Sequence, residues 1–239
     1  MKSLYLFVAV FCCIQSVVSQ EIPAPYNFRI KPGTESWRKL ETHDEMIKVC
    51  RIPNDTLKRL TTAALLETSL SYPLMMDFLA SNNIKSGFDN TYKAFNGYQE
   101  LMNRPDFAST LIRYYQSLDI ARVNTIPTLA DKGYYSNKVC VVELFFGTSG
   151  FVNSLGAANR KQLVALLLDK LSAKTKHADV YGFTGQVSAV YAMANVMAVS
   201  ESKQEILKKE GLNAFKTQLI FKDGTVLNEI ISLAKAFIL

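Results

Sequence analysis

The stretch VYGFTGQVSAVYAMANVMAVS, residues 180–200, decides the fold class because it carries no charged side chain. The apolar run is interrupted by small or polar residues, which are Gly182, Thr184, Gln186, Ser188 and Asn195. These interruptions argue against a membrane-spanning helix, which requires predominantly apolar residues. A helix that is apolar on nearly every side yet rich in small residues is typical of the centre of a packed domain. We therefore expect residues 180–200 to form the innermost helix of the protein.

This prediction specifies which side chains of the central helix should be buried. We expect the buried set to include Val187, Val190, Tyr191, Ala194, Val196 and Met197. The amides of Gln186 and Asn195 would then require hydrogen-bond partners, because an unpaired buried amide costs about 1–3 kcal/mol.

Helical signals surround this stretch from residue 34 to the end of the chain. Thr42 and Glu45 have the spacing of a capping box, which marks the start of a helix. Residues 139–146 contain enough β-branched residues for a buried strand, although their neighbours favour a helix. Asp223-Gly224 could form a hairpin turn, although a turn into a last helix is favoured. The predicted fold class is all-α, a compact multi-helix bundle or an irregular α-α array, with room for one short hairpin near the C-terminus.

The N-terminus has the layout of a secretory signal peptide. Lys2 supplies a positive charge, residues 4–14 form an apolar run, and small residues precede a predicted cleavage after Ser19. The run is too short to span a bilayer. We therefore expect residues 1–19 to be removed. The mature chain should be exported to the periplasm or the extracellular space, soluble and without stable membrane insertion.

The mature chain is expected to consist of a short leader and one domain. Residues 20–33 contain three prolines, which block regular structure and predict an extended leader. Residues 34–239 are numerous enough to bury the core of a single helical domain. Residues 120–137 are the least regular part of it, with Pro127 and Gly133, and are a candidate hinge.

Charge and motif content argue against several classes of function. The net charge of +6 is spread along the chain without a basic stripe, so nucleic acid is not an expected partner. The sequence contains no Gly-rich phosphate loop and no paired zinc-ligand motif, so neither a cofactor nor a metal is expected. Export would allow a disulfide between Cys50 and Cys140. Two separate buried thiols are favoured, because both cysteines lie in apolar, helical-looking segments.

Candidate catalytic residues are scarce, since His43 and His177 are the only histidines. His43 precedes Asp44 and Glu45, but adjacent helix positions point in different directions and do not converge on a metal ion. Residues 147–151, GTSGF, resemble a nucleophile elbow without its second glycine, which favours a turn between two helices. A hydrolase would require one of the histidines within hydrogen-bond reach of a nucleophile or carboxylate in a cleft.

Residues 72–104, YPLMMDFLASNNIKSGFDNTYKAFNGYQELMNR, combine aromatic rings with amide and carboxylate groups at the ends of short helices. Such groups could line a recognition groove. The candidate ligand-binding residues are Tyr72, Asp77, Asn82, Asn83 and Asn96. The competing interpretation is structural and is favoured, since Asn and Asp are preferred at helix caps. In that interpretation Gly87 and Gly97 permit tight turns.

This segment also carries a resemblance. With YNFRIKPGTESW at residues 26–37 and YGFTGQVSAVYAMANVM at residues 181–197, it resembles a group of uncharacterised exported bacterial proteins. These proteins share a YPL…D…NN…G…FNG…EL pattern, and the similarity would cover nearly the whole mature chain. The resemblance implies a bacterial exported helical domain and carries over no activity or catalytic residue.

The predicted function is that of an exported, all-helical binding or interaction module. Its partner would be a protein, a peptide or a glycan, because stacked helices without a catalytic cluster commonly offer a groove to such ligands. The alternative is a hydrolase that acts outside the cytoplasm.

Overall fold

Helices make up the regular structure of residues 21–239, which the computed structural model describes apart from the side chain of Glu201. The only β pairing in this part of the chain is an isolated parallel bridge between Ile22 and Leu60, so the predicted all-α class is confirmed. The N-terminal half contains α1 (Glu35–Arg38), α2 (His43–Val49), α3 (Asn54–Arg59), α4 (Thr62–Ser69), η1 (Met75–Ala80), α5 (Ile84–Ala94), α6 (Asn96–Met102), α7 (Phe107–Ser117) and η2 (Ile120–Asn124). The C-terminal half contains α8 (Leu129–Phe146), α9 (Ser149–Asn153), α10 (Ala157–Thr175), α11 (Ala178–Ala198), α12 (Glu201–Gln204), η3 (Ile206–Lys208), α13 (Glu210–Gln218) and α14 (Thr225–Ile238).

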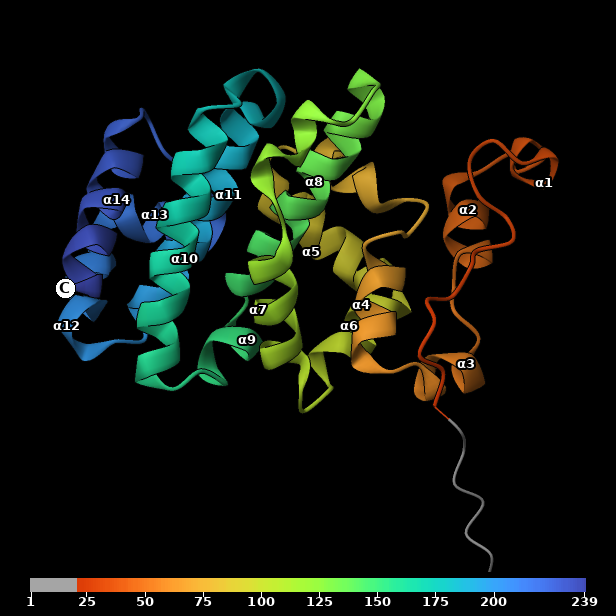
Figure 1. Cartoon of the computed structure of the whole chain (residues 1–239), viewed down its shortest axis with the longest axis horizontal. Helices are drawn as coiled ribbons and strands as arrows, with labels where there is room; N and C mark the ends of the chain where they lie inside the picture. The colour runs from red at the N-terminus through yellow and green to blue at the C-terminus, as the bar shows by residue number, and fades with distance from the viewer. Residues whose placement is uncertain (1–20) are drawn as a thin grey trace, which may run out of the picture.

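α11 is the central helix of the C-terminal half and packs against α8, α10 and α14 (Figure 1). The side chains predicted to be buried on it are all buried, namely Val187, Val190, Tyr191, Ala194, Val196 and Met197. Ala192 and Ala194 are also free of solvent contact, and their small side chains let neighbouring helices approach closely. The prediction of an innermost helix in this stretch is confirmed.

The uncharged stretch is nevertheless not one continuous helix. α11 is interrupted at Gly182, where φ is 53° and ψ is −159°. A positive φ is accessible to glycine because it has no Cβ, so Gly182 allows the chain to change direction here. Phe183, the next residue, is left exposed. The expectation of a regular helix from residue 180 is therefore wrong at its first turn.

Both ambiguous segments are helical. Residues 139–146 form the second half of α8 and are all buried, so their apolar content reflects burial on every side of a helix. The Asp223 carboxylate accepts hydrogen bonds from the amide and the hydroxyl of Thr225, at 2.8 and 2.5 Å. Thr225 is the first residue of α14, so the turn leads into a helix, and the described chain has no hairpin there.

Most of the candidate hinge at residues 120–137 is helical. Residues 120–124 form η2, and α8 begins at Leu129. Thr128 caps α8, because its hydroxyl accepts a hydrogen bond from the amide of Asp131 at 3.1 Å. Gly133 lies inside the helix and Pro127 lies before the cap, so neither residue breaks α8.

The leader is packed onto the domain. Residues 21–33 contain no helix, as predicted, but Phe28 is buried. Its ring meets Tyr26, Tyr72 and Phe95 with centroid distances of 5.2 to 6.2 Å. The leader is thus part of the folded unit and closes one side of its aromatic core.

Further predictions concern the signal peptide, the membrane and the cysteines. The predicted signal peptide, residues 1–19, lies outside the described residues. None of the helices between residues 21 and 239 has the length and apolar character needed to cross a membrane. Cys50 and Cys140 are free and buried, which confirms the prediction of two separate thiols.

Candidate functional site

The predicted binding segment, residues 72–104, spans η1, α5 and α6 and contributes to two separate hollows. Tyr72 and Asp77 line one hollow together with residues of α2. Asn82 and Asn83 line another, against α13. The candidate residues therefore do not converge on a single site.

The first hollow, which we name the His43 pocket, has a volume of about 380 Å³. It is lined by His43, Ile47, Tyr72, Asp77, Ala80, Ser81, Asn90, Thr91 and Ala94. The predicted capping box of Thr42 and Glu45 is present and fixes the start of α2, so His43 occupies its first turn. Nε2 of His43 lies 2.7 Å from Oδ2 of Asp77 in η1, and the two side chains form a hydrogen-bonded pair.

This pair meets only half of the requirement for a hydrolase. A carboxylate is in place, but no hydroxyl or thiol of the described residues is hydrogen-bonded to His43. The side chains of His43 and Asp77 are 59% and 37% exposed, so water screens the pair. Cys50, the C-cap residue of α2, is buried. Burial raises the pKa of its thiol to about 11, so Cys50 stays protonated and is a poor nucleophile.

The second histidine lies elsewhere. His177 is the residue before α11, at its junction with α10. Its ring has no carboxylate or hydroxyl partner among residues 21–239. In the same part of the chain no three histidine, cysteine or acidic side chains converge in a way that could hold a metal ion.

A larger depression, the α5–α13 groove, consists of two adjoining hollows of about 450 and 600 Å³. Both hollows are lined by Lys85, Asp89 and Thr217, where they meet. The first is also lined by Gly147, Thr148, Ser149, Val152, Asn153, Tyr191, Asn195, Ala198, Val199 and Lys216. The second is also lined by Asn82, Asn83, Ser86, Gln218, Leu219, Ile220 and Phe221. The groove therefore brings together α5, the α8–α9 turn, the end of α11 and α13.

Asn83 connects the two walls of this groove. Its Oδ1 accepts a hydrogen bond from the amide of Ser86 at 2.9 Å and so caps the start of α5. Its Nδ2 donates to the carbonyl of Gln218 at the end of α13, at 3.1 Å. The structural interpretation of Asn83 as a cap is thus correct, and the same side chain also sets the distance between the walls.

The floor of the groove is held in place by hydrogen bonds of Asn195 and by the packing of Tyr191 on Gly147. Nδ2 of Asn195 donates to the carbonyl groups of Tyr191 and Lys216, at 3.0 and 3.1 Å, which supplies the partners predicted for this amide. The ring of Tyr191 packs over Gly147, where an added Cβ would lie 2.0 Å from the ring. Gly147 and Thr148 form the turn between α8 and α9, whereas Ser149, Gly150 and Phe151 already belong to α9, so the turn is shorter than predicted. The close approach of the Tyr191 ring requires glycine at position 147.

Asn96 has a structural role away from both hollows. It is buried, and its side chain bonds to the amide and the carbonyl of Ile52, at 3.1 and 2.8 Å. Gly87 and Gly97 lie inside α5 and α6, so the expectation that they form tight turns is wrong. At Gly87 an added Cβ would lie 1.8 Å from the carbonyl oxygen of Phe78, because η1 and α5 pack with their backbones in contact.

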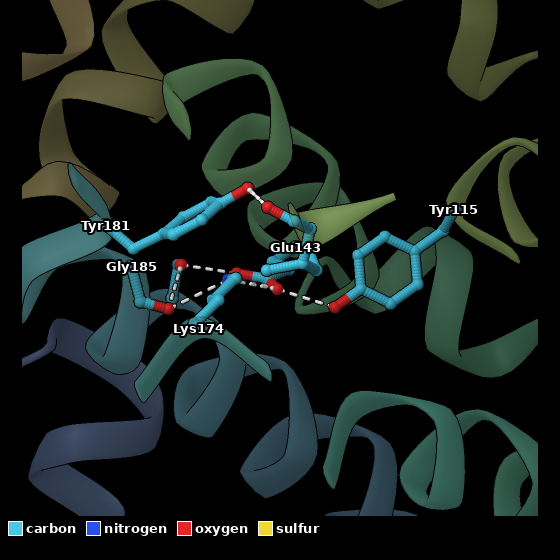
Figure 2. A network of polar contacts seen from close by, with 7 residues as sticks. Tyr115, Glu143, Lys174, Tyr181 and Gly185 are labelled. Carbon is cyan, nitrogen blue, oxygen red and sulfur yellow. Dashed lines mark hydrogen bonds and ion pairs between the residues drawn. The ribbon is translucent and has the colours of Figure 1, made fainter. Parts of the chain in front are cut away.

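One cluster was not predicted. Glu143 of α8 and Lys174 of α10 form an ion pair that has no solvent exposure, with Nζ 2.5 and 2.6 Å from the two carboxylate oxygens (Figure 2). The carboxylate also accepts hydrogen bonds from the hydroxyls of Tyr115 and Ser188, at 2.6 and 2.5 Å. Lys174 donates further to the carbonyl of Gly185 at 2.9 Å. The cluster joins α7, α8, α10 and α11.

This cluster is structural because no ligand can reach it. Each of its side chains is buried and hydrogen-bonded within the cluster. Burial raises the pKa of Tyr115 well above its usual value, so its hydroxyl keeps the proton that it donates to Glu143. The sequence signal for the cluster is the lone acid in the apolar run VCVVELFF, residues 139–146. A charge within a buried helix requires a partner.

No family model, no curated protein and no solved structure matches this chain.

Proposed function

We propose that the chain is an exported, all-helical binding module that takes up a polar peptide or glycan in the α5–α13 groove. The observation that carries this proposal is a set of polar side chains in the groove with no role in the fold. The side chains of Asn82, Ser149, Asn153 and Lys216 line the groove and have no hydrogen-bond or ion-pair partner in residues 21–239. Unpartnered amide, hydroxyl and ammonium groups are available to a ligand rich in amides or hydroxyls.

The shape and charge of the groove support the same proposal. Its two hollows adjoin, so an extended ligand has room to lie along them. Lys85 and Asp89, one turn apart on α5, form an ion pair of 2.5 Å at the point where the hollows meet. The groove therefore offers both signs of charge together with neutral hydrogen-bonding groups. We also propose that the predicted signal peptide exports the chain. We propose further that the chain belongs to the group of bacterial proteins that it resembles.

The proposal is tested by filling the groove. Thr217 is exposed, lines both hollows, and donates its hydroxyl hydrogen bond to the carbonyl of Asn213. We expect Thr217→Trp to abolish retention on a peptide library and a glycan array without a change in melting temperature. The matched control is Thr175→Trp, because Thr175 is also exposed near a helix end and bonds to the carbonyl of Ser172. Equal loss of binding in both variants, or no ligand for the unmodified protein, would contradict the proposal.

A hydrolase remains the second candidate, and the His43–Asp77 pair in its pocket is the observation that favours it. A carboxylate that orients a histidine is a common part of a general-base system. Chromogenic ester, amide and glycoside substrates test this candidate with the unmodified protein and the His43→Gln variant. Turnover that disappears in the variant would favour the hydrolase, and absence of turnover would favour the binding module.

A further inference from the structure

A third hollow, the α10–α12 pocket, lies away from the proposed binding groove and is rich in positive charge. It has a volume of about 290 Å³ and is lined by Ala157, Arg160, Lys161, Ser200, Ser202, Lys203, Ala236 and Phe237. These residues come from the start of α10, from α12 and from the end of α14. α12 and the end of α14 lie at one end of the molecule in Figure 1, and α1 lies at the other.

Three cations line this small pocket, and among the side chains that the structure describes no acidic group lines it with them. Arg160, Lys161 and Lys203 form no ion pair and donate no side-chain hydrogen bond to any part of the described chain. The Nε of Arg160 is buried and unpartnered. Like charges held together destabilise a fold, and a buried donor without an acceptor adds to that cost. An anion in the pocket would relieve the repulsion between the three cations.

The last turn of α14 is the alternative partner for these cations. Its carbonyl groups lie near the pocket, which Ala236 and Phe237 line. A helix C-terminus attracts positive charge. No hydrogen bond, however, connects Arg160, Lys161 or Lys203 to those carbonyls. The cations are therefore not used to cap α14.

Neighbouring groups also suit an anion. Ser200 and Ser202 have their hydroxyl oxygens 3.1 Å apart, and only one of the two can use its proton for that bond. The other hydroxyl can donate to a ligand. α10 begins at the pocket with no side-chain cap and no acidic residue in its first turn, which adds to the positive potential.

We propose that the α10–α12 pocket binds a phosphate group. The charge of three cations is balanced better by a doubly charged anion than by a carboxylate, which carries one negative charge. The tetrahedral phosphate also presents enough acceptor oxygens for the guanidinium, the ammonium groups and the serine hydroxyl together. Arg160 binds the phosphate through its guanidinium group, with Lys161 and Lys203 at the rim. The group belongs either to free inorganic phosphate or to the phosphate monoester of a lipid headgroup.

Calorimetric titration of the mature protein with inorganic phosphate tests the proposal. Arg160→Gln should weaken phosphate binding about tenfold, because one charge-assisted hydrogen bond is lost. Arg38→Gln is the matched control: it removes the same charge from an exposed arginine in α1, at the opposite end of the molecule. Lys161→Gln changes an exposed side chain, so it should weaken binding without any risk to folding.

Sedimentation with vesicles distinguishes the two sources of the phosphate. Vesicles of phosphatidic acid should retain the unmodified protein and the Arg38→Gln variant, and release Arg160→Gln, if the ligand is a headgroup. Calorimetric binding without vesicle binding identifies free phosphate. The proposal is wrong if the unmodified protein binds neither probe, or if Arg38→Gln and Arg160→Gln weaken binding equally.

Discussion

The buried pair of Glu143 and Lys174 makes a quantitative prediction about stability. Glu143→Gln would leave the Lys174 ammonium group without a counter-charge in a site that has no solvent exposure. Lys174→Met would leave the Glu143 carboxylate in the same condition. Loss of one partner of a buried pair costs about 3–5 kcal/mol. For a chain of this size we expect each single variant to melt about 10 °C below the unmodified protein.

The double variant separates coupling from independent effects. In Glu143→Gln with Lys174→Met both charges are gone, and the glutamine carbonyl can still accept the hydrogen bond from Tyr115, while its amide group can donate to the hydroxyl oxygen of Ser188. We therefore expect the double variant to be more stable than either single variant. Independent effects would instead sum to about 6–10 kcal/mol, which is comparable with the whole stability of a domain.

Urea unfolding followed by circular dichroism at 222 nm measures all four proteins. The control for nonspecific charge loss is Lys48→Gln, because Lys48 is exposed on α2 and has no ion-pair partner in residues 21–239. The reasoning would be refuted if the double variant did not fold, or if its loss in free energy of unfolding equalled the sum of the losses in the two single variants. It would also be refuted by single variants that unfold at the same urea concentration as the control.

Further predictions concern the core, the thiols and the mature terminus. Ala194→Glu should prevent stable folding, measured by loss of the thermal transition, because it buries an unpaired charge at a fully buried position. Asn96→Ala should lower the free energy of unfolding by about 2–4 kcal/mol in urea titration, since two backbone groups lose their partner. Burial raises the pKa of Cys50 to about 11 and of Cys140 to about 12, so a thiol reagent at pH 8 should label both only after unfolding. Between about pH 9 and 11 the unfolded chain loses these protons first, so stability should fall as the pH rises through that window. Mass spectrometry of the exported protein should find Gln20 as the first residue, and a product that retains the preceding segment would contradict the predicted cleavage.

Features set by near neighbours in the chain could be predicted from the sequence. The capping box of Thr42 and Glu45 is local, so its spacing identified the start of α2. The burial of most of α11 followed from the composition of residues 180–200, because a helical stretch without charge has no face that suits water. Local patterns also supported the helical assignment of residues 139–146.

Contacts between distant elements could not be predicted, because periodicity identifies the apolar face of a helix but not the neighbour that it meets. Asn83 and Gln218 are 135 residues apart, so no pattern predicted that they connect two walls of a groove. The side chain of Lys174 in α10 reaches Glu143 in α8, 31 residues away, and no pattern in the sequence predicted this contact. Gly87 was predicted to permit a tight turn. It is a glycine because α5 packs against the backbone of η1 at this position and leaves no room for a Cβ, and the sequence does not reveal that contact.

The position of α1 and α2 has a consequence for the lifetime of the His43 pocket. Neither helix contains a buried side chain, and in Figure 1 both lie at the end of the molecule beyond α4 and α6. Elements with few buried groups open at a lower free energy than the core. Amide hydrogen exchange should therefore be faster in residues 35–49 than in α8 or α11.

When α2 opens, His43 leaves Asp77 and the pocket ceases to exist. A catalytic pair must hold its geometry through many turnovers, which a short-lived docked helix does not favour. Capture of a ligand is different, because a ligand that bridges α2 and η1 would hold the helix closed. Slower exchange in residues 35–49 upon addition of a ligand would thus report occupancy of this pocket, whereas a ligand in the α5–α13 groove would leave that exchange unchanged.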